Sequence, residues 1–258
     1  MDKYDLVVLQ NAIPMEVNEA IAGYAYKHEV DVVLNPIPAK KLSKELMECV
    51  TYMIVNEQAA KSMTGIKIHS DWKREWTRFN LDEARVASAV IRGRGVPTVL
   101  ITLAEKGVIM NTPERFYYKK AIEDVEMVDP RAAGDAFIGA FCTRICTDDS
   151  IGKVLSIANY TAALSIATEG AIESLPTSKQ VREYMEQKEM HKNASLFCCL
   201  NNIRTWKLFL ADSSCWTSVC ASSTFHACIC IDYVLSVSFA DSSCWASSFA
   251  SSTRNTSV

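Results

Sequence analysis

Short apolar runs alternate with segments of helical periodicity over the first 190 residues of the chain. Unbroken apolar runs rich in β-branched residues predict strands, and they lie at 6–9, 30–34, 52–55, 96–103 and 107–110. Apolar residues at intervals of three and four predict helices, at 16–28, 82–92, 132–146, 150–167 and 179–189. This alternation is typical of an α/β fold in which helices cover both faces of a mostly parallel sheet.

The predicted elements indicate which side chains pack inward and where a ligand binds. Residues 104–107 predict a hairpin between the last two strands. The helices at 132–146 and 150–167 are apolar nearly all round, so we expect them to be central. In sheets of this kind ligands bind beyond the carboxyl ends of the strands. The apolar helix faces are predicted to be Val17, Ala20, Ile21 and Tyr24 in the first helix, and Ala84, Val86, Ala87, Val90 and Ile91 in the second.

The last third of the chain has a different composition. All nine glycines lie between Gly23 and Gly170, and the last of the seven prolines is Pro176. Turns and helix ends of a further α/β domain would need such residues. Seven of the ten cysteines lie at 198–244, and the segment 211–224 recurs as 240–253. We therefore expect two parts, a folded domain over 1–190 and a low-complexity Ser/Cys/Trp tail over 191–258 that is unstructured.

Charge and hydropathy exclude several classes of partner. The net charge is 27 − 30 = −3, which gives no positive field for a nucleic-acid backbone. The apolar stretch 225–240 is too short to span a membrane and contains Asp232. The first residues lack a secretory signal, so the expected location is cytoplasmic. Metal chemistry is not favoured either: His226, Cys228 and Cys230 lack a paired Cys-x-x-Cys, Cys142 and Cys146 suit core packing, and His28 and His69 are expected at the surface.

The segment Ala132-Ala-Gly-Asp135 is the strongest candidate for chemistry. It follows a short extended stretch and opens an apolar helix, and its small residues allow backbone N–H groups to approach an anion. Asp135 beside these amides can accept a proton from an attacking hydroxyl while they stabilise a phosphoryl group. Taken alone, the segment is more typical of an ordinary helix start with an acidic first turn, because short glycine motifs match by chance in many proteins.

Several motifs in order resemble the ribokinase family of PfkB-type carbohydrate kinases, specifically its carboxyl-terminal, ATP-binding part. They are Leu9–Pro14, Leu34–Ala39, Asn56-Glu57 with Thr64-Gly65, Val99–Leu103 with Gly107, Val128-Asp129, Ala132–Phe137, and Ala158-Asn159 through Gly170-Ala171. The resemblance implies a three-layer α/β/α Rossmann-type sheet, present here in part. It also implies transfer of the ATP γ-phosphoryl group to the primary hydroxyl of ribose, giving ribose 5-phosphate.

The resemblance also implies site residues and cofactors. Asp135 would be the base, and Ala132, Ala133 and Gly134 would complete the anion hole. Residues beside the nucleotide would be Asn56, Thr102, Leu103, Ala104, Lys106, Gly107 and Asn159. Magnesium would bridge the phosphates, and a monovalent cation, usually potassium, would lie beside the anion hole at Asp129, Arg131, Ser165, Thr168, Gly170 and Ser174. Ser165 and Thr168 are equally consistent with plain helix packing. A small-molecule sugar and ATP would be the ligands; the family's homodimer forms through a lid that has no match here.

The chain departs from the family pattern at positions that matter for chemistry. The Gly-rich sugar site of the amino-terminal part has no match, and Ala12 stands where a glutamate near the sugar is usual. Ala59 replaces the acid of Asn-x-x-Glu, and Ala104 replaces a glycine and would be strained if its φ is positive. Pro130 and Arg131 replace small residues before the anion hole.

Three hypotheses therefore stay open. The first is a sugar kinase whose activity is impaired by the missing part. The second is a catalytically dead kinase-like module that binds nucleotide or only provides an interaction surface. The third is that the chain is incomplete or misjoined, which the abrupt start and the unrelated tail both suggest.

Overall fold

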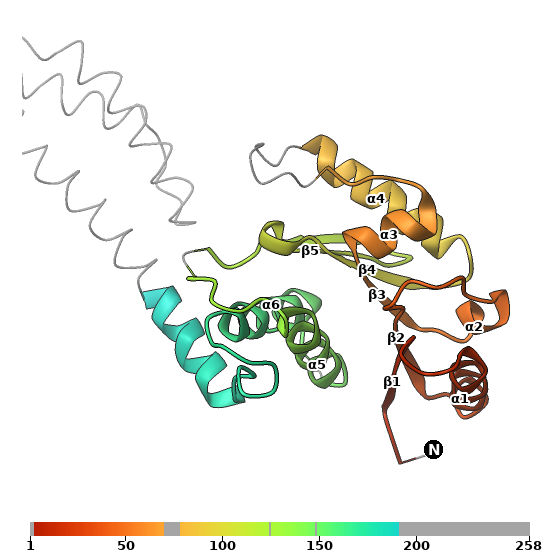
Figure 1. Cartoon of the computed structure of the whole chain (residues 1–258), viewed down its shortest axis with the longest axis horizontal. Helices are drawn as coiled ribbons and strands as arrows, with labels where there is room; N and C mark the ends of the chain where they lie inside the picture. The colour runs from red at the N-terminus through yellow and green to blue at the C-terminus, as the bar shows by residue number, and fades with distance from the viewer. Residues whose placement is uncertain (1–2, 70–77, 124, 148, 191–258) are drawn as a thin grey trace, which may run out of the picture. The chain divides into compact units, whose positions relative to one another are not determined.

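The computed structural model describes residues 3–69, 78–123, 125–147 and 149–190 (Figure 1). Residues Met1–Glu186 form one compact unit. The tail predicted over 191–258, with its cysteines and the rejected zinc site, lies outside the described residues. None of the helices in the described ranges is both long and apolar enough to span a membrane.

Six strands of the described chain form one sheet in the order in which they occur in the sequence. They are β1 (Leu6–Gln10), β2 (Asp31–Asn35), β3 (Tyr52–Asn56), β4 (Thr98–Thr102), β5 (Val108–Asn111) and β6 (Phe116–Lys119). β1 to β4 pair in parallel, whereas β4, β5 and β6 pair antiparallel. The predicted α/β class and the five predicted strands are confirmed; β6 was missed because its aromatic residues are all half-buried and show no alternation.

The helices divide between the two faces of the sheet. They are α1 (Met15–Lys27), α2 (Lys44–Glu48), α3 (Glu57–Thr64), α4 (Arg78–Arg92), α5 (Ala133–Ile145) and α6 (Ile151–Ile166), with a 3-10 turn η1 (Ala104–Lys106) and a further helix over 178–190. α1 to α4 lie on one side and α5 and α6 on the other (Figure 1). Val32 and Leu34 of β2 face the first side and Val33 faces the second, so alternate side chains build two separate cores.

Two predicted helix faces are partly wrong. In α1 the buried side chains are Asn18, Ala22 and Ala25, whereas Val17 and Tyr24 are exposed. Small residues allow this helix to lie close to the sheet. Burial of the polar Asn18 side chain is compensated by a hydrogen bond, in which its Nδ2 donates to the Gln10 carbonyl at 2.9 Å. In α4, Ala84, Ala87 and Ile91 are buried as predicted, while Val86 and Val90 are exposed.

The hairpin between β4 and β5 depends on two special backbone positions. Gly107 has φ 102°, and a Cβ there would lie 2.1 Å from the Lys119 carbonyl oxygen, so no other residue fits. Ala104 also has a positive φ, 45°, although it carries a side chain. The strain expected if Ala104 had a positive φ is therefore built into this loop.

Candidate functional site

Each of the four parallel strands ends in a polar residue. Gln10, Asn35, Asn56 and Thr102 are the last residues of β1, β2, β3 and β4. Gln10 pairs in register with Asn35, and Asn56 pairs with Thr102. Because carboxyl ends of parallel strands meet at one edge of a sheet, these side chains form a polar row where α/β proteins bind ligands. We call these four residues the strand-end row.

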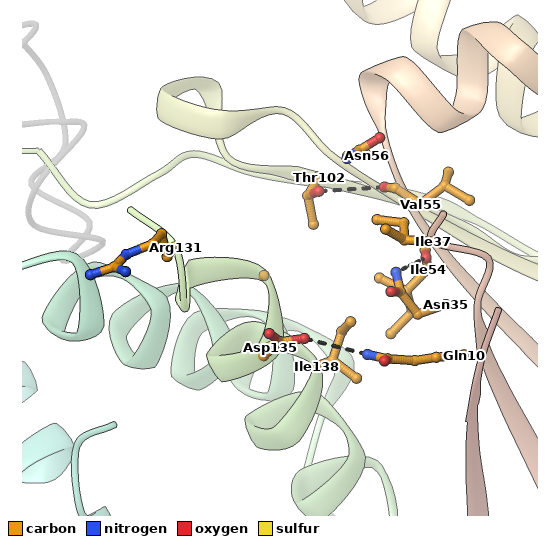
Figure 2. Close-up of a pocket in the computed structure, with 11 residues that line it drawn as sticks. Gln10, Asn35, Ile37, Ile54, Val55, Asn56, Thr102, Arg131, Asp135 and Ile138 are labelled. Carbon is orange, nitrogen blue, oxygen red and sulfur yellow. Dashed lines mark hydrogen bonds between the residues drawn. The ribbon is translucent and has the colours of Figure 1, made fainter. Parts of the chain in front are cut away.

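An open pocket of about 390 Å³ lies between the strand-end row and the start of α5 (Figure 2). Its volume is in the range of small-molecule sites. Asn35 is held in place by the neighbouring strand β3, since its Nδ2 donates to the Ile54 carbonyl at 2.8 Å. The remaining lining residues are Ile37, Ile54, Val55, Arg131, Gly134, Asp135 and Ile138.

The start of α5 presents backbone N–H groups to this pocket. No side chain caps the helix at Ala132. The Ala133 N–H donates to the Pro130 carbonyl at 3.2 Å, whereas the amides of Gly134 and Asp135 have no backbone acceptor among the residues that the structure describes. A Cβ on Gly134 would meet nothing within 4 Å, so the space beside it is open. Free amides at a positive helix end are suited to bind an anion.

Asp135 is the carboxylate of the pocket. It lies in the first turn of α5 and is exposed, and its Oδ1 accepts a long hydrogen bond of 3.4 Å from Gln10 Nε2 (Figure 2). Gln10 is itself held by Asn18 of α1 through its carbonyl. Residues 125 positions apart in the sequence therefore face one another across the pocket. A carboxylate here can accept a proton from a bound hydroxyl group beside the helix amides.

A second carboxylate, Asp129, ties the loop before α5 to the segment after α6. Its side chain is only 8% exposed, and Arg131 Nε donates to Oδ1 at 2.9 Å and to Oδ2 at 3.0 Å. The Gly170 N–H donates to Oδ2 at 3.0 Å. Hydrogen bonds from the Arg131 side chain, then from the backbone N–H groups of Arg131 and Gly170, hold the pKa of Asp129 well below its ordinary range. Asp129 is therefore ionised at neutral pH.

The predicted cation residues are brought together only in part. Asp129, Arg131 and Gly170 meet directly, but Ser165 Oγ donates to the Ala162 carbonyl at 2.8 Å and Ser174 Oγ to the Ala171 carbonyl at 3.0 Å. Thr168 is exposed at the end of α6. Because a guanidinium group already occupies the approach to both oxygens of Asp129, this arrangement does not fit a bound potassium ion.

The residues predicted beside the nucleotide separate into two groups. Asn56 and Thr102 line the pocket, whereas Leu103, Ala104, Lys106, Gly107 and Asn159 do not. Leu103 is fully buried, and its N–H donates to the Gly107 carbonyl at 2.7 Å. Asn159 is buried in α6, and its Nδ2 donates to the Lys120 carbonyl at 2.9 Å. Their role in nucleotide binding stays a prediction.

Sequence reasoning missed Gln10 and Asn35 as site residues. The signal that could have found them is a polar residue directly after an apolar run, repeated at the ends of the strands at 6–10 and 31–35. Ile54, Val55 and Ile138 gave no such signal, because an apolar residue that lines a pocket looks like any core residue in the sequence.

Oxygen atoms in the pocket are of the kind that magnesium binds. Asp135 supplies a carboxylate, and Asn56 supplies a side-chain carbonyl that accepts one hydrogen bond from the Ala59 N–H at 2.8 Å and keeps a second lone pair. These donors fit an ion that arrives with substrate phosphates. Among the described residues, no group of three or more His, Cys, Asp or Glu side chains is placed to hold a metal.

Taken together, the fold and the pocket define an α/β protein with a small-molecule site at the carboxyl edge of its sheet, facing the start of a helix. Residues 2–178 match the family described as pfkB family carbohydrate kinase, so the chain belongs to this family.

Individual relatives agree with this assignment. The chain is 32% identical over 182 residues to the ribokinase of Haemophilus influenzae, and 31% identical over 180 residues to that of Staphylococcus aureus. These alignments cover 70% and 69% of the chain and 56% of each relative. The structure of Arabidopsis thaliana ribokinase complexed with ribose and ATP matches with a TM-score of 0.64 and 26% identity, over 70% of this chain and 56% of that one. The chain thus spans little more than half the length of the relatives it matches.

Proposed function

We propose that this chain takes part in ATP-dependent phosphorylation of the primary hydroxyl of a sugar, with ribose as substrate and ribose 5-phosphate as product. The observation that carries the proposal is the position of Asp135, which lies beside the free amides of α5 and faces the strand-end row across the pocket. Family membership and the ribokinase relatives support it.

In the proposed reaction, the pocket aligns a sugar hydroxyl with the terminal phosphoryl group of ATP. Asp135 accepts the hydroxyl proton as the new O–P bond forms, and the bond between the γ-phosphorus and its bridging oxygen breaks to release ADP. The Gly134 and Asp135 amides stabilise the charge on the transferring group, as positive ends of helices do. Gln10, which donates to Asp135, orients the carboxylate.

Magnesium and the nucleotide belong to the same proposal. Asn56 and Asp135 would face a magnesium ion carried by the phosphates, and the ion would neutralise their charge. We assign the nucleotide to the side of the pocket formed by Asn56 and Thr102, with the loop Leu103–Gly107 and Asn159 as its further boundary. The proposed ligands are a small sugar and ATP, and the proposed location is the cytoplasm. Nucleic acid is not a proposed partner, because the net charge of −3 gives no positive field for its backbone.

Calorimetry and kinetics on one pair of variants test the proposal. We expect the full chain to bind MgATP, and Asp135→Asn to bind it with similar affinity while any phosphotransfer to ribose falls by at least about 10²-fold, because the base is removed. Gly134→Val should weaken nucleotide binding by filling the open space, whereas Gly139→Val, whose Cβ also meets nothing within 4 Å, lies outside the pocket and serves as the matched control. Absence of MgATP binding at millimolar concentration would contradict the nucleotide site.

A second candidate function is a catalytically dead kinase-like module. It is favoured by Ala12 and Ala59, which stand where the family usually has acids, and by the match to only part of the relatives. In that case Asp135→Asn leaves nucleotide binding and every other measurable property unchanged, and no phosphotransfer to ribose occurs in the unsubstituted chain. The same pair of measurements therefore separates the two functions.

A further inference from the structure

The loop before α5 is joined to the end of α6 by backbone hydrogen bonds and by one acidic side chain. The N–H groups of Val128 and Asp129 both donate to the Ile166 carbonyl, at 2.8 and 3.0 Å, and the Asp129 carboxylate accepts from the Gly170 N–H. A carboxylate that is 8% exposed needs a compensating charge. This junction lies directly before the amides that face the pocket, so the partner of Asp129 influences how firmly those amides are held.

Arg131 supplies that charge from within the same loop. Its Nε contacts both carboxylate oxygens, its Nη2 lies 2.5 Å from Oδ2, and its backbone N–H donates to Oδ1 at 3.1 Å. Figure 2 shows the guanidinium group directed away from the Gln10–Asp135 pair. The contact is a planar, two-pronged one, which is the geometry that arginine forms with carboxylates.

We propose that the guanidinium group of Arg131 takes the place of a monovalent cation at this junction, so that the loop before α5 holds its shape without bound potassium. A diffusible cation would have to displace the guanidinium group of Arg131, which is covalently attached two residues from Asp129 and contacts both of its carboxylate oxygens. The significance for catalysis rests on the proposed function, but the state of the junction can be measured without it.

Thermal unfolding of the full chain tests the proposal. Potassium chloride and tetramethylammonium chloride are compared at one ionic strength of about 0.1 M, so that screening is equal. We expect the melting temperature of the unsubstituted chain to be the same in both salts. Arg131→Ala removes the guanidinium group and keeps the backbone. In tetramethylammonium chloride we expect this variant to melt at a lower temperature than the unsubstituted chain. Added potassium should then raise its melting temperature by about 2–4 °C in a saturable way.

Two further variants separate the charge from mere packing. Arg131→Lys keeps a cation and should show no potassium response. Arg144→Ala breaks another arginine contact, to Asp149 at 3.8 Å, and should respond equally to both salts. A saturable rise with potassium in the unsubstituted chain would overturn the proposal even if Arg131→Ala does not fold. An Arg131→Ala protein that folds but ignores potassium would also overturn it.

Titration with MgATP completes the test. We expect the dissociation constant of the unsubstituted chain to be within about twofold in the two salts, which is less than 0.5 kcal/mol. Affinity about tenfold higher in potassium would contradict the proposal. If MgATP does not bind in either salt, the proposed function fails, while the melting temperatures still decide the role of Arg131.

Discussion

Ala104 adopts a backbone conformation that is unfavourable for a residue with a side chain. Its φ is 45°, in the left-handed region where a Cβ is unfavourable, and it opens the 3-10 turn that joins β4 to β5. A glycine is usual at this position in the family that the chain resembles. The hairpin is retained because the Gly107 N–H donates to the Ala104 carbonyl at 3.1 Å and the Leu103 N–H donates to the Gly107 carbonyl at 2.7 Å.

We expect Ala104→Gly to stabilise the domain by about 1 kcal/mol, because it relieves the left-handed strain. Urea denaturation measures the free energy of unfolding directly. Gly65→Ala is the opposite control: Gly65 has φ 77° with open space around its Cβ position, so this change should destabilise by a similar amount. A neutral or destabilising effect of Ala104→Gly would show that the loop relaxes around the alanine.

At the scale of elements, α5 connects the core to the pocket. Its inner face carries Phe137 and Phe141, whose rings stack with centroids 6.4 Å apart, and Phe141 meets Tyr52 of β3 edge-on at 5.7 Å. Cys142 on the same helix is buried, as predicted, and this burial raises the pKa of its thiol to about 12. The core packing predicted for Cys146 is wrong, because this residue follows the last turn of α5 and is exposed. The first turn of the same helix carries Asp135, so packing against the sheet determines where the carboxylate lies.

Phe141→Ala should therefore lower the free energy of unfolding by about 3–5 kcal/mol, since a fully buried ring is removed. MgATP affinity should fall as well, because α5 loses its support against the sheet. Thr143→Ala is the control from the exposed side of the helix and should change stability by less than about 0.5 kcal/mol. Equal effects of the two substitutions would contradict the assignment of the inner face.

At the scale of the whole molecule, the chain divides by composition. The family match ends at residue 178, and beyond Pro176 the chain contains neither glycine nor proline. Residues 191–258 carry seven thiols and three tryptophans but few charges, a composition that favours self-association.

We expect a chain of residues 1–193 to keep the circular-dichroism spectrum and MgATP affinity of the full chain and to be more soluble. A chain of residues 1–168 is the control: it lacks Gly170, whose N–H donates to Asp129, and also the buried Ser174 and Val181, so it should unfold less cooperatively. Loss of cooperative unfolding in the 1–193 chain would show that later residues belong to the core.

The sequence by itself determined the features that depend on neighbours along the chain. Apolar runs such as Leu6–Leu9 and Tyr52–Val55 located strands to within a residue or two, because the strand pattern is local. The order of motifs indicated the family, and Ala132–Asp135 marked the start of α5. The change of composition after Pro176 predicted a domain boundary near residue 190, which stays a prediction.

Only the tertiary structure decided which residues face one another. Strand register brings Gln10 beside Asn35, and the packing of α5 against the sheet brings Asp135 to Gln10 across the pocket, although these residues are distant in the sequence. The inward face of α1 was decided by how closely small residues approach the sheet, which periodicity does not reveal. Arg131, expected among potassium ligands, instead contacts Asp129 directly. The physical reason is common to all three: contact between distant segments depends on register, helix rotation and side-chain reach, and none of these is encoded in a local pattern.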